Sequence, residues 1–181
     1  MSETKYIINQ KPRAWIGCLG CYNGGNLRGL WVDGVDAADT DGAGLSSGGR
    51  CLYCGGDEFW VMDYEGYGEI LGGECSPLEA AKVAAAIDQI EDGGHDIERV
   101  IAYASNLSLS LEDWDEWRLN YEDALLPYGS ALEYAEAMVD EGLLGDIPEH
   151  LAGYIDTEKL ARDMEMGGEV WESNGYLFRN L

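Results

Sequence analysis

The sequence carries a large excess of negative charge, and this charge is distributed unevenly along the chain. Thirty-five acidic residues stand against eleven basic residues, which gives a formal net charge of −24. Residues 1–50 are neutral overall, whereas residues 51–110 carry −10 and residues 111–181 carry −14. Self-repulsion on this scale works against any compact fold. Adaptation to high salt would spread acidity over the whole surface, so the asymmetry favours a specific use for the negative charge beyond residue 50.

The charge also discriminates between classes of partner. Proteins that bind nucleic acid neutralise phosphates with Lys and Arg, so we expect no direct binding to DNA or RNA. By the same reasoning, a basic protein that itself binds nucleic acid is a suitable partner. The N-terminal segment MSETKYIINQKPR has no apolar stretch of signal-peptide length, and no run of about 18 apolar residues occurs elsewhere. We therefore expect a cytoplasmic protein that does not span a membrane.

The N-terminal third has the pattern of a small antiparallel sheet. Residues 13–33 read as two strands around the turn sequence Asn23-Gly24-Gly25-Asn26, and residues 58–64 read as a third strand. Between them, residues 34–50 are rich in Gly, Asp and Ser, as loops are.

Helix signals dominate the following segment. Ser76-Pro77-Leu78-Glu79 has the form of a capping box with proline at the first helical position, and Gly93-Gly94 marks the end of that helix. Further helices are expected after Asp96, Ser110, Ser130 and Asp156. The helix after Ser130 should turn Leu132, Ala135, Met138 and Val139 inward. A final hairpin is expected around Asn174-Gly175, so the fold class is α+β.

Two Cys-x-x-Cys pairs give the sharpest metal-like signal. Cys18 and Cys21 form the first pair, and Cys51 and Cys54 form the second, which is followed by two glycines as in a metal knuckle. Four thiolates at this spacing can close a structural zinc site. The first pair, however, lies in an expected strand, where residues i and i+3 point to opposite faces. We therefore predict no metal and no cofactor, with zinc at these four cysteines as the alternative. The fifth cysteine makes the number odd, which argues against a disulfide framework.

Catalysis finds little support in the sequence. The two histidines, His95 and His150, lie far apart along the chain, and neither is near a nucleophile motif. Phosphate-binding, metalloprotease, esterase and dinucleotide-binding signatures are missing. We therefore predict that the protein is not an enzyme. Trp114 and Trp117 lie at helical spacing among acids, and we expect them to be buried supports of an acidic face.

Several stretches together resemble one protein family. Residues 14–33 (AWIGCLGCYNGGNLRGLWVD) are similar to the opening strands of the ArdA antirestriction family, and residues 60–67 (WVMDYEGY) are similar to its aromatic-acidic segment. The sequences YAE at 134–136, GLL at 142–144, IPE at 147–149 and YID at 154–156 resemble its antirestriction region. Residues 160–165 (LARDME) and the aromatic tail resemble its C-terminus.

This resemblance implies an elongated, curved chain of three small domains. They would be an N-terminal antiparallel sheet (13–74), a central helical acidic domain (75–120) and a C-terminal mixed domain (121–181) with the antirestriction and dimerisation region. Residues 34–56 depart from the family, because many relatives have an acidic helix where this chain has glycines and two cysteines. The presence of a helix in the first domain is thus in doubt.

The resemblance also implies a function. The family imitates bent DNA with surface carboxylates and occupies the DNA-binding groove of type I restriction-modification enzymes, which blocks restriction, and we expect it to block modification as well. Such proteins protect incoming mobile DNA and form homodimers. The alternative is an acidic interaction module stabilised by zinc, without an antirestriction role. We predict candidate dimer contacts at Leu143, Leu144 and Ile147. The predicted mimic surface comprises Glu112, Asp113, Asp115, Glu116, Glu122, Asp123, Glu133, Glu136, Asp140 and Glu141.

Overall fold

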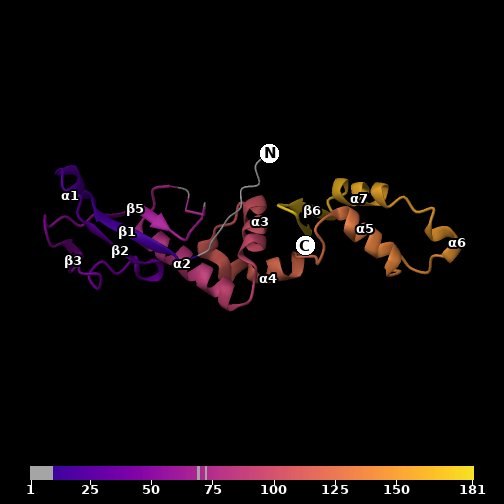
Figure 1. Cartoon of the computed structure of the whole chain (residues 1–181), viewed down its shortest axis with the longest axis horizontal. Helices are drawn as coiled ribbons and strands as arrows, with labels where there is room; N and C mark the ends of the chain where they lie inside the picture. Colours follow the sequence, from indigo (N-terminus) through magenta and orange to yellow (C-terminus); the bar gives the residue numbers. More distant parts are fainter. Residues whose placement is uncertain (1–9, 69, 72) are drawn as a thin grey trace. The chain divides into compact units, whose positions relative to one another are not determined.

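The computed structural model describes residues 10–181 except 69 and 72. Its elements in chain order are shown in Figure 1. The strands are β1 (Arg13–Cys18), β2 (Gly29–Asp33), β3 (Ser46–Ser47), β4 (Arg50–Cys51), β5 (Phe59–Glu65), β6 (Val170–Ser173) and β7 (Tyr176–Arg179). The α-helices are α1 (Leu19–Asn23), α2 (Pro77–Asp92), α3 (Ile97–Leu107), α4 (Trp114–Ala124), α5 (Ala131–Asp140), α6 (Glu149–Ala152) and α7 (Thr157–Met166), and the 3-10 helices are η1 (Gly34–Asp36) and η2 (Leu111–Asp113).

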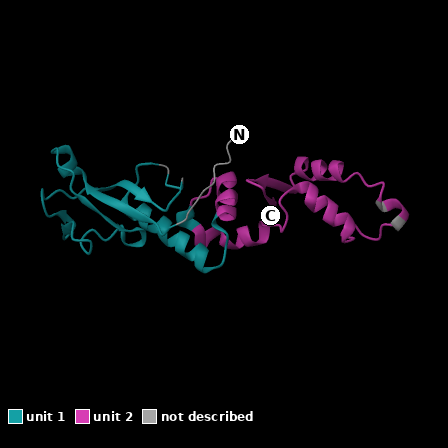
Figure 2. Cartoon of the chain, viewed as in Figure 1, with its two compact units in different colours: residues 1–97, 111–113 teal, residues 98–110, 114–181 magenta. Residues whose placement is uncertain are grey.

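The chain divides into two compact units (Figure 2). The first unit comprises the chain up to residue 97 together with residues 111–113, and the second comprises 98–110 and 114–181. Both contain helices and small antiparallel sheets, so the α+β class is confirmed. This division does not resolve three domains, and the three-domain arrangement stays a prediction. Within the described ranges, no helix is long and apolar enough to cross a membrane.

The first unit is built on a three-stranded antiparallel sheet with the order β2-β1-β5. The expected third strand is therefore confirmed, and it pairs with β1 in a register that shifts between Trp15 and Ile16. One face of the sheet packs against α2 through Ile16, Val61, Ala84 and Ile87, all of which are buried. Apolar burial between sheet and helix thus supplies the core of this unit.

Helix α2 begins as its sequence predicts. The Ser76 hydroxyl accepts a hydrogen bond from the Glu79 amide, and the Glu79 carboxylate accepts one from the Ser76 amide. These bonds satisfy two amides that the first turn of a helix leaves without an internal partner. The helix ends at Asp92 and is capped by Gly93, again as expected. The segment between η1 and β5 contains β3 and β4 and no helix, as its glycine-rich sequence predicts.

The second unit contains an aromatic cluster centred on Tyr103 of α3. Its ring lies 5.4–5.9 Å from the rings of Trp117, Tyr121, Trp171 and Phe178, measured between centroids. These residues come from α3, α4, β6 and β7, so one set of ring contacts holds four elements together. The β6–β7 hairpin turns at Asn174 and Gly175, whose φ angles are 51° and 80°. Positive φ at both positions is the requirement of the type I′ turn that the sequence predicts.

The inward face of α5 differs from the expected stripe. Ala131 and Ala135 are fully buried against Ala161 and Met164 of α7, whereas Leu132 is 38% exposed. Residues 131 and 135 are separated by about one turn, so they share a face, and Leu132 is rotated about 100° away from it. The expectation that Leu132 points inward was therefore wrong. Small alanine side chains allow α5 and α7 to approach closely. The expected inward stripe, which began with Leu132, did not indicate this contact.

Candidate functional site

Helix α4 presents acids on the side opposite to its aromatic core residues. Trp114 and Trp117 are 2% and 6% exposed, which confirms that they are buried supports. The indole nitrogen of Trp117 donates a hydrogen bond to the Ser110 carbonyl at 3.0 Å. Four of the predicted residues lie exposed on the remaining surface of the helix: Asp115, Glu116, Glu122 and Asp123. Burial of the tryptophans therefore fixes which way these carboxylates point.

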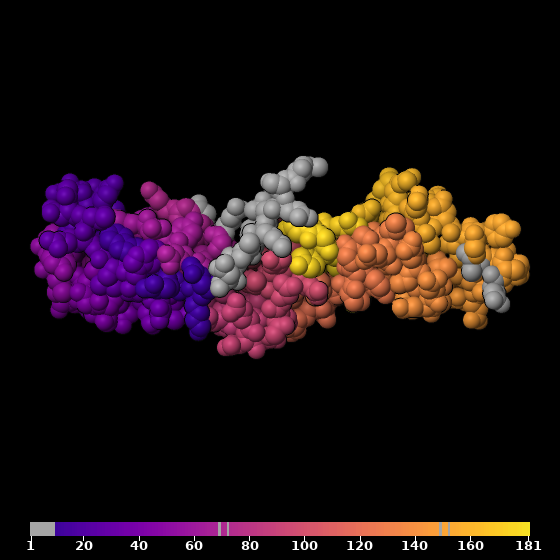
Figure 3. Space-filling model, viewed as in Figure 1, coloured from indigo at the N-terminus to yellow at the C-terminus, as the bar shows by residue number. Residues whose placement is uncertain are grey.

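Helix α5, which belongs to the orange part of the chain in Figure 3, carries a second group of exposed acids. Glu133, Glu136 and Asp140 are exposed, and Glu141 is the residue that caps the C-terminus of the helix. The Glu133 carboxylate also accepts a hydrogen bond from the Gly129 amide at 2.8 Å. At a rise of about 1.5 Å per residue, Glu136 and Asp140 are roughly 6 Å apart along the helix axis.

The remaining two predicted acids belong to the first unit. Glu112 and Asp113 form part of η2, which the contacts group with α2. Glu112 is half-buried, and its Oε2 lies 3.2 Å from the Lys82 Nζ in an ion pair. Asp113 is exposed. The ten predicted residues are thus distributed over both units, and the charge of Glu112 is offset by a lysine of its own unit.

Several helices end in carboxylates, where the helix dipole disfavours them. We refer to the last-turn acids of α2, α4, α5 and α7 as the acidic helix ends. None of these four helices has a basic residue in its last turn. A helix C-terminus carries a partial negative charge, so an acid there is destabilising and a base stabilising. The acidic helix ends comprise Glu91, Asp92, Glu122, Asp123, Asp140, Asp163 and Glu165, with Glu141 as the cap of α5. A carboxylate at this end lowers the stability of its helix unless a cation offsets it, as Lys159 does for Asp163. The placement therefore favours a role for this charge other than stability.

The candidate dimer residues lie in the segment that follows α5. Leu143 and Leu144 are 58% and 39% exposed, and Ile147 is half-buried. The chain turns sharply there, because Gly142 and Gly145 have φ angles of 69° and 92°. Two large apolar side chains are therefore displayed next to the acids of α5.

The four cysteines of the two pairs come together in the first unit. The thiol sulfurs of Cys18, Cys21, Cys51 and Cys54 all lie within 4.8 Å of one another. The expectation that the first pair points to opposite faces of a strand was wrong, because β1 ends at Cys18 and Cys21 lies on the helical turn α1. In a helical turn, residues i and i+3 share a side. Cys75, the fifth cysteine, is buried in the main core of the unit and is not part of this cluster.

The pKa values of two cysteines in the cluster shift in opposite directions. Burial raises the pKa of Cys21 to about 12, with a further contribution from the neighbouring thiols. Burial also opposes ionisation of Cys51, but hydrogen bonds from the amides of Tyr53 and Cys54, together with the thiols of Cys18 and Cys21, lower its pKa to about 7. Amide donors aimed at a sulfur stabilise its thiolate form.

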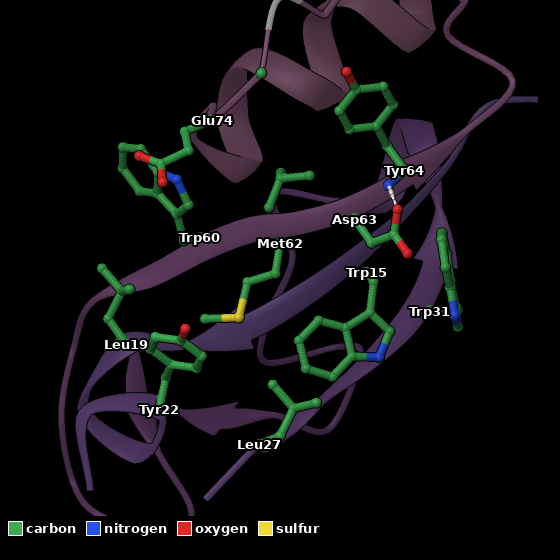
Figure 4. A pocket seen from close by; sticks show the side chains of 12 residues that line it. Trp15, Leu19, Tyr22, Leu27, Trp31, Trp60, Met62, Asp63, Tyr64 and Glu74 are labelled. Carbon is green, nitrogen blue, oxygen red and sulfur yellow. Dashed lines mark hydrogen bonds between the residues drawn. The ribbon is translucent and has the colours of Figure 1, made fainter. Parts of the chain in front are cut away.

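An aromatic groove of about 880 Å³ occupies the sheet face away from α2 (Figure 4). Trp15, Trp31 and Trp60 line it, and a methionine, Met62, lies over the sheet among them. A Cβ atom at Gly17 or Gly29 would overlap the Trp15 ring, so these two paired glycines provide the space that the ring occupies. Asp63 and Glu74 are its charged lining residues. The three tryptophans come from three different strands, β1, β2 and β5, so no single strand shows a pattern and the sequence did not indicate the groove.

The exposed acids and the small antiparallel sheets with their helices define a small, strongly acidic α+β protein. A comparison with known families matches the ArdA antirestriction protein family over residues 14–178. The chain therefore belongs to the ArdA family of antirestriction proteins, which is a non-enzymatic family, and this confirms the resemblance seen in the sequence. Membership implies an antirestriction function. A search of the curated proteins found no match.

Proposed function

We propose that this protein inhibits type I restriction-modification enzymes by occupying their DNA-binding groove, with its exposed carboxylates in place of DNA phosphates. The observation that carries the proposal is the set of acidic helix ends. These carboxylates are exposed and destabilise the helices on which they lie. A partner surface rich in Lys and Arg accounts for them, because it would compensate the electrostatic cost on binding.

The magnitude of the charge supports a distributed surface. Helix α4 has four acids and Arg118 over eleven residues, a net charge of −3 along about 16 Å. That is roughly one charge per 5–6 Å, compared with about one per 3.4 Å for a single DNA strand and one per 1.7 Å for the duplex. One helix cannot match a duplex, so several acidic segments must act together. A homodimer would carry twice −24, which equals the charge on roughly 80 Å of duplex.

The proposed inhibition is competitive and electrostatic. A carboxylate surface offers no base edges, so the inhibitor does not depend on the DNA sequence that the enzyme recognises. Binding should weaken steeply with salt, because ions condensed on both surfaces are released on association. Occupancy of the shared DNA-binding groove would block modification as well as cleavage.

We further propose that the protein acts as a homodimer through Leu143, Leu144 and Ile147. Exposed leucines next to a highly charged helix are suited to pairing with a second copy, which would join two acidic surfaces into one longer footprint. Sedimentation of Leu143→Glu/Leu144→Glu tests this directly, with Leu78→Glu as the control, since Leu78 is also 58% exposed. Dimers that persist in the double variant would refute the assignment.

The function is tested by titrating the purified protein into cleavage and methylation assays of a type I enzyme. The key variant neutralises Asp115, Glu116, Glu136, Asp140 and Glu141 as Asn or Gln. If each carboxylate contributes about 0.3–0.5 kcal/mol in an exposed ion pair, the five changes together weaken binding by roughly ten- to seventyfold. Single changes should each have little effect.

A matched control separates position from total charge. Neutralising Asp36, Asp57 and Glu58 removes exposed acids from the first unit, near the neutral N-terminal segment. It should leave inhibition within about twofold of the wild type, since long-range charge is screened beyond roughly 10 Å. Equal losses per charge in the two variants, or tight binding of the wild type to DNA itself, would contradict the proposal.

A further inference from the structure

The cysteine cluster has the geometry of a metal site. The Sγ atoms of Cys18 and Cys54 are 3.5 Å apart, and those of Cys21 and Cys51 are 3.6 Å apart. Zinc binds thiolates at about 2.3 Å, so the edges of a tetrahedral four-sulfur site are about 3.8 Å long. All the sulfurs lie within 4.8 Å of one another, close to that figure. A disulfide, at about 2.0 Å, is much shorter than either of these pair distances.

The backbone around the second pair has the form of a metal knuckle. Cys51 receives hydrogen bonds from the amides of Tyr53 and Cys54, two and three residues further along the chain. The Gly55 amide donates to the Cys51 carbonyl at 2.9 Å, and Gly55 has a φ of 73°, a conformation that favours glycine. These contacts fold residues 51–55 tightly around the sulfur of Cys51 and bring Cys54 back toward it.

The first pair is arranged in a similar way. Cys18 lies at the end of β1 and receives a hydrogen bond from the amide of Cys21, three residues later. Gly20 lies close to the cluster, because a Cβ atom at that position would be 3.2 Å from the Cys54 sulfur. Amide groups directed at ligating sulfurs are a common outer-shell feature of thiolate metal sites. Both Cys-x-x-Cys segments therefore approach one centre with matching local geometry.

Charge and packing give two further arguments. The Arg28 guanidinium lies over the Tyr53 ring at 4.8 Å, and the Arg50 side chain donates to the Gly55 carbonyl at 3.2 Å. Two of the eleven basic residues are thus held at the knuckle, where they can offset the net −2 of four thiolates and one Zn²⁺. Ala37 and Leu45 anchor the first part of the 34–58 segment in the main core. Around residues 50–58 the local core consists of Cys18, Cys21 and Cys51 with Phe59 against them, which is little apolar surface to hold this part of the chain.

We propose that Cys18, Cys21, Cys51 and Cys54 bind one Zn²⁺ in a structural tetrathiolate site. Four protein ligands leave no open coordination position, so the ion would hold residues 50–58 against the end of the sheet and take no part in catalysis. The proposal goes beyond the proposed function and does not depend on it. A zinc-free protein that still inhibits restriction would leave that function intact.

The test is the metal content of protein purified without chelators or added metal. We expect about one zinc per chain by elemental analysis. Replacement by Co²⁺ should give the visible bands of a tetrahedral thiolate complex. Thiol titration in denaturant with chelator should find all five cysteines reduced. Two disulfides would leave a single titratable thiol and overturn the proposal, as would stoichiometric iron without zinc.

Substitutions locate the site. Cys51→Ala and Cys54→Ala should weaken zinc binding by more than about tenfold in competition with a chromophoric chelator. Cys54 is the exposed member of the cluster, so its replacement disturbs the core least. Cys75→Ala is the control. Cys75 is buried in the main core, outside the cluster, so this variant should retain the metal. Zinc retained equally in Cys51→Ala and Cys75→Ala would refute the assignment, and so would wild-type protein that binds neither Zn²⁺ nor Co²⁺.

Discussion

Removing two carboxylates from the end of α5 should stabilise the protein while weakening its inhibition. Asp140 is the last residue of the helix and Glu141 is its cap, so both lie at the negative end of the helix dipole. Relief of that interaction contributes about 0.3–1 kcal/mol per charge. Loss of the repulsion between Glu136 and Asp140, four residues apart, adds about 0.2–0.5 kcal/mol. The variant Asp140→Asn/Glu141→Gln should therefore gain about 0.8–2.5 kcal/mol at low ionic strength.

The matched comparison removes the same charge from the opposite end of a helix. Asp115 and Glu116 lie in the first turn of α4, where the dipole favours acids. Asp115→Asn/Glu116→Gln should lose stability, although it lowers the net charge equally. Both variants should inhibit the restriction enzyme less well than the wild type.

Thermal unfolding followed by circular dichroism distinguishes the two effects. For a chain of this length, about 1 kcal/mol moves the midpoint by roughly 2–4 °C. The α5 variant should rise by several degrees, and the α4 variant should fall. High salt should reduce both shifts, because it screens exposed charges. Equal shifts in the same direction would mean that overall charge repulsion dominates, and the reasoning from the acidic helix ends would then be refuted.

Three further predictions concern single positions. Tyr103→Ala should cost about 3–5 kcal/mol in chemical denaturation, because it removes the ring that joins α3, α4 and the β6–β7 hairpin; a loss below about 1 kcal/mol would contradict this role. Gly175→Ala should cost about 1–2 kcal/mol, since a φ of 80° strains any other residue; a neutral effect would show that the turn readjusts. The pKa of Asp41 is lowered by hydrogen bonds from the Ser46 hydroxyl and the Gly49 and Gly48 amides. Its contribution is therefore complete above its unfolded pKa of about 4 and is lost as the pH falls through the lower folded value, so Asp41→Asn should be less stable than the wild type at neutral pH and match it in strong acid. A pH-independent difference would exclude this linkage.

The regular elements were predictable because their signals are local. The capping box at Ser76, the glycines after α2 and α7, and the Asn174-Gly175 turn each depend on a few adjacent residues. Amphipathic spacing likewise identified α4 and placed Trp114 inside. The exposure of the four predicted acids of α4 follows from the same spacing, since buried aromatics determine its outer face.

The cysteine cluster was mispredicted because its geometry depends on one boundary between elements. If the strand continued beyond Cys18, the side chains of Cys18 and Cys21 would point to opposite faces. Instead the strand ends at Cys18, and the short helix α1 brings the two side chains together. A single helical turn has too few residues to show a period. The ion pair of Glu112 with Lys82 joins positions thirty residues apart, and the small-residue contact between α5 and α7 is also tertiary, so neither has a local signature.

The path of the chain between its two units restricts how such proteins can exchange parts. Residues 98–110 belong to the second unit, yet the chain returns to the first at 111–113, where Leu111 is buried, before leaving again. A recombination event with one crossover near residue 97 would therefore combine residues 1–97 of one protein with the η2 segment of another, although both belong to the first unit. Chimeras between relatives should tolerate junctions after residue 113 better than junctions between 97 and 111, and gene shuffling in this lineage should preserve that interval intact.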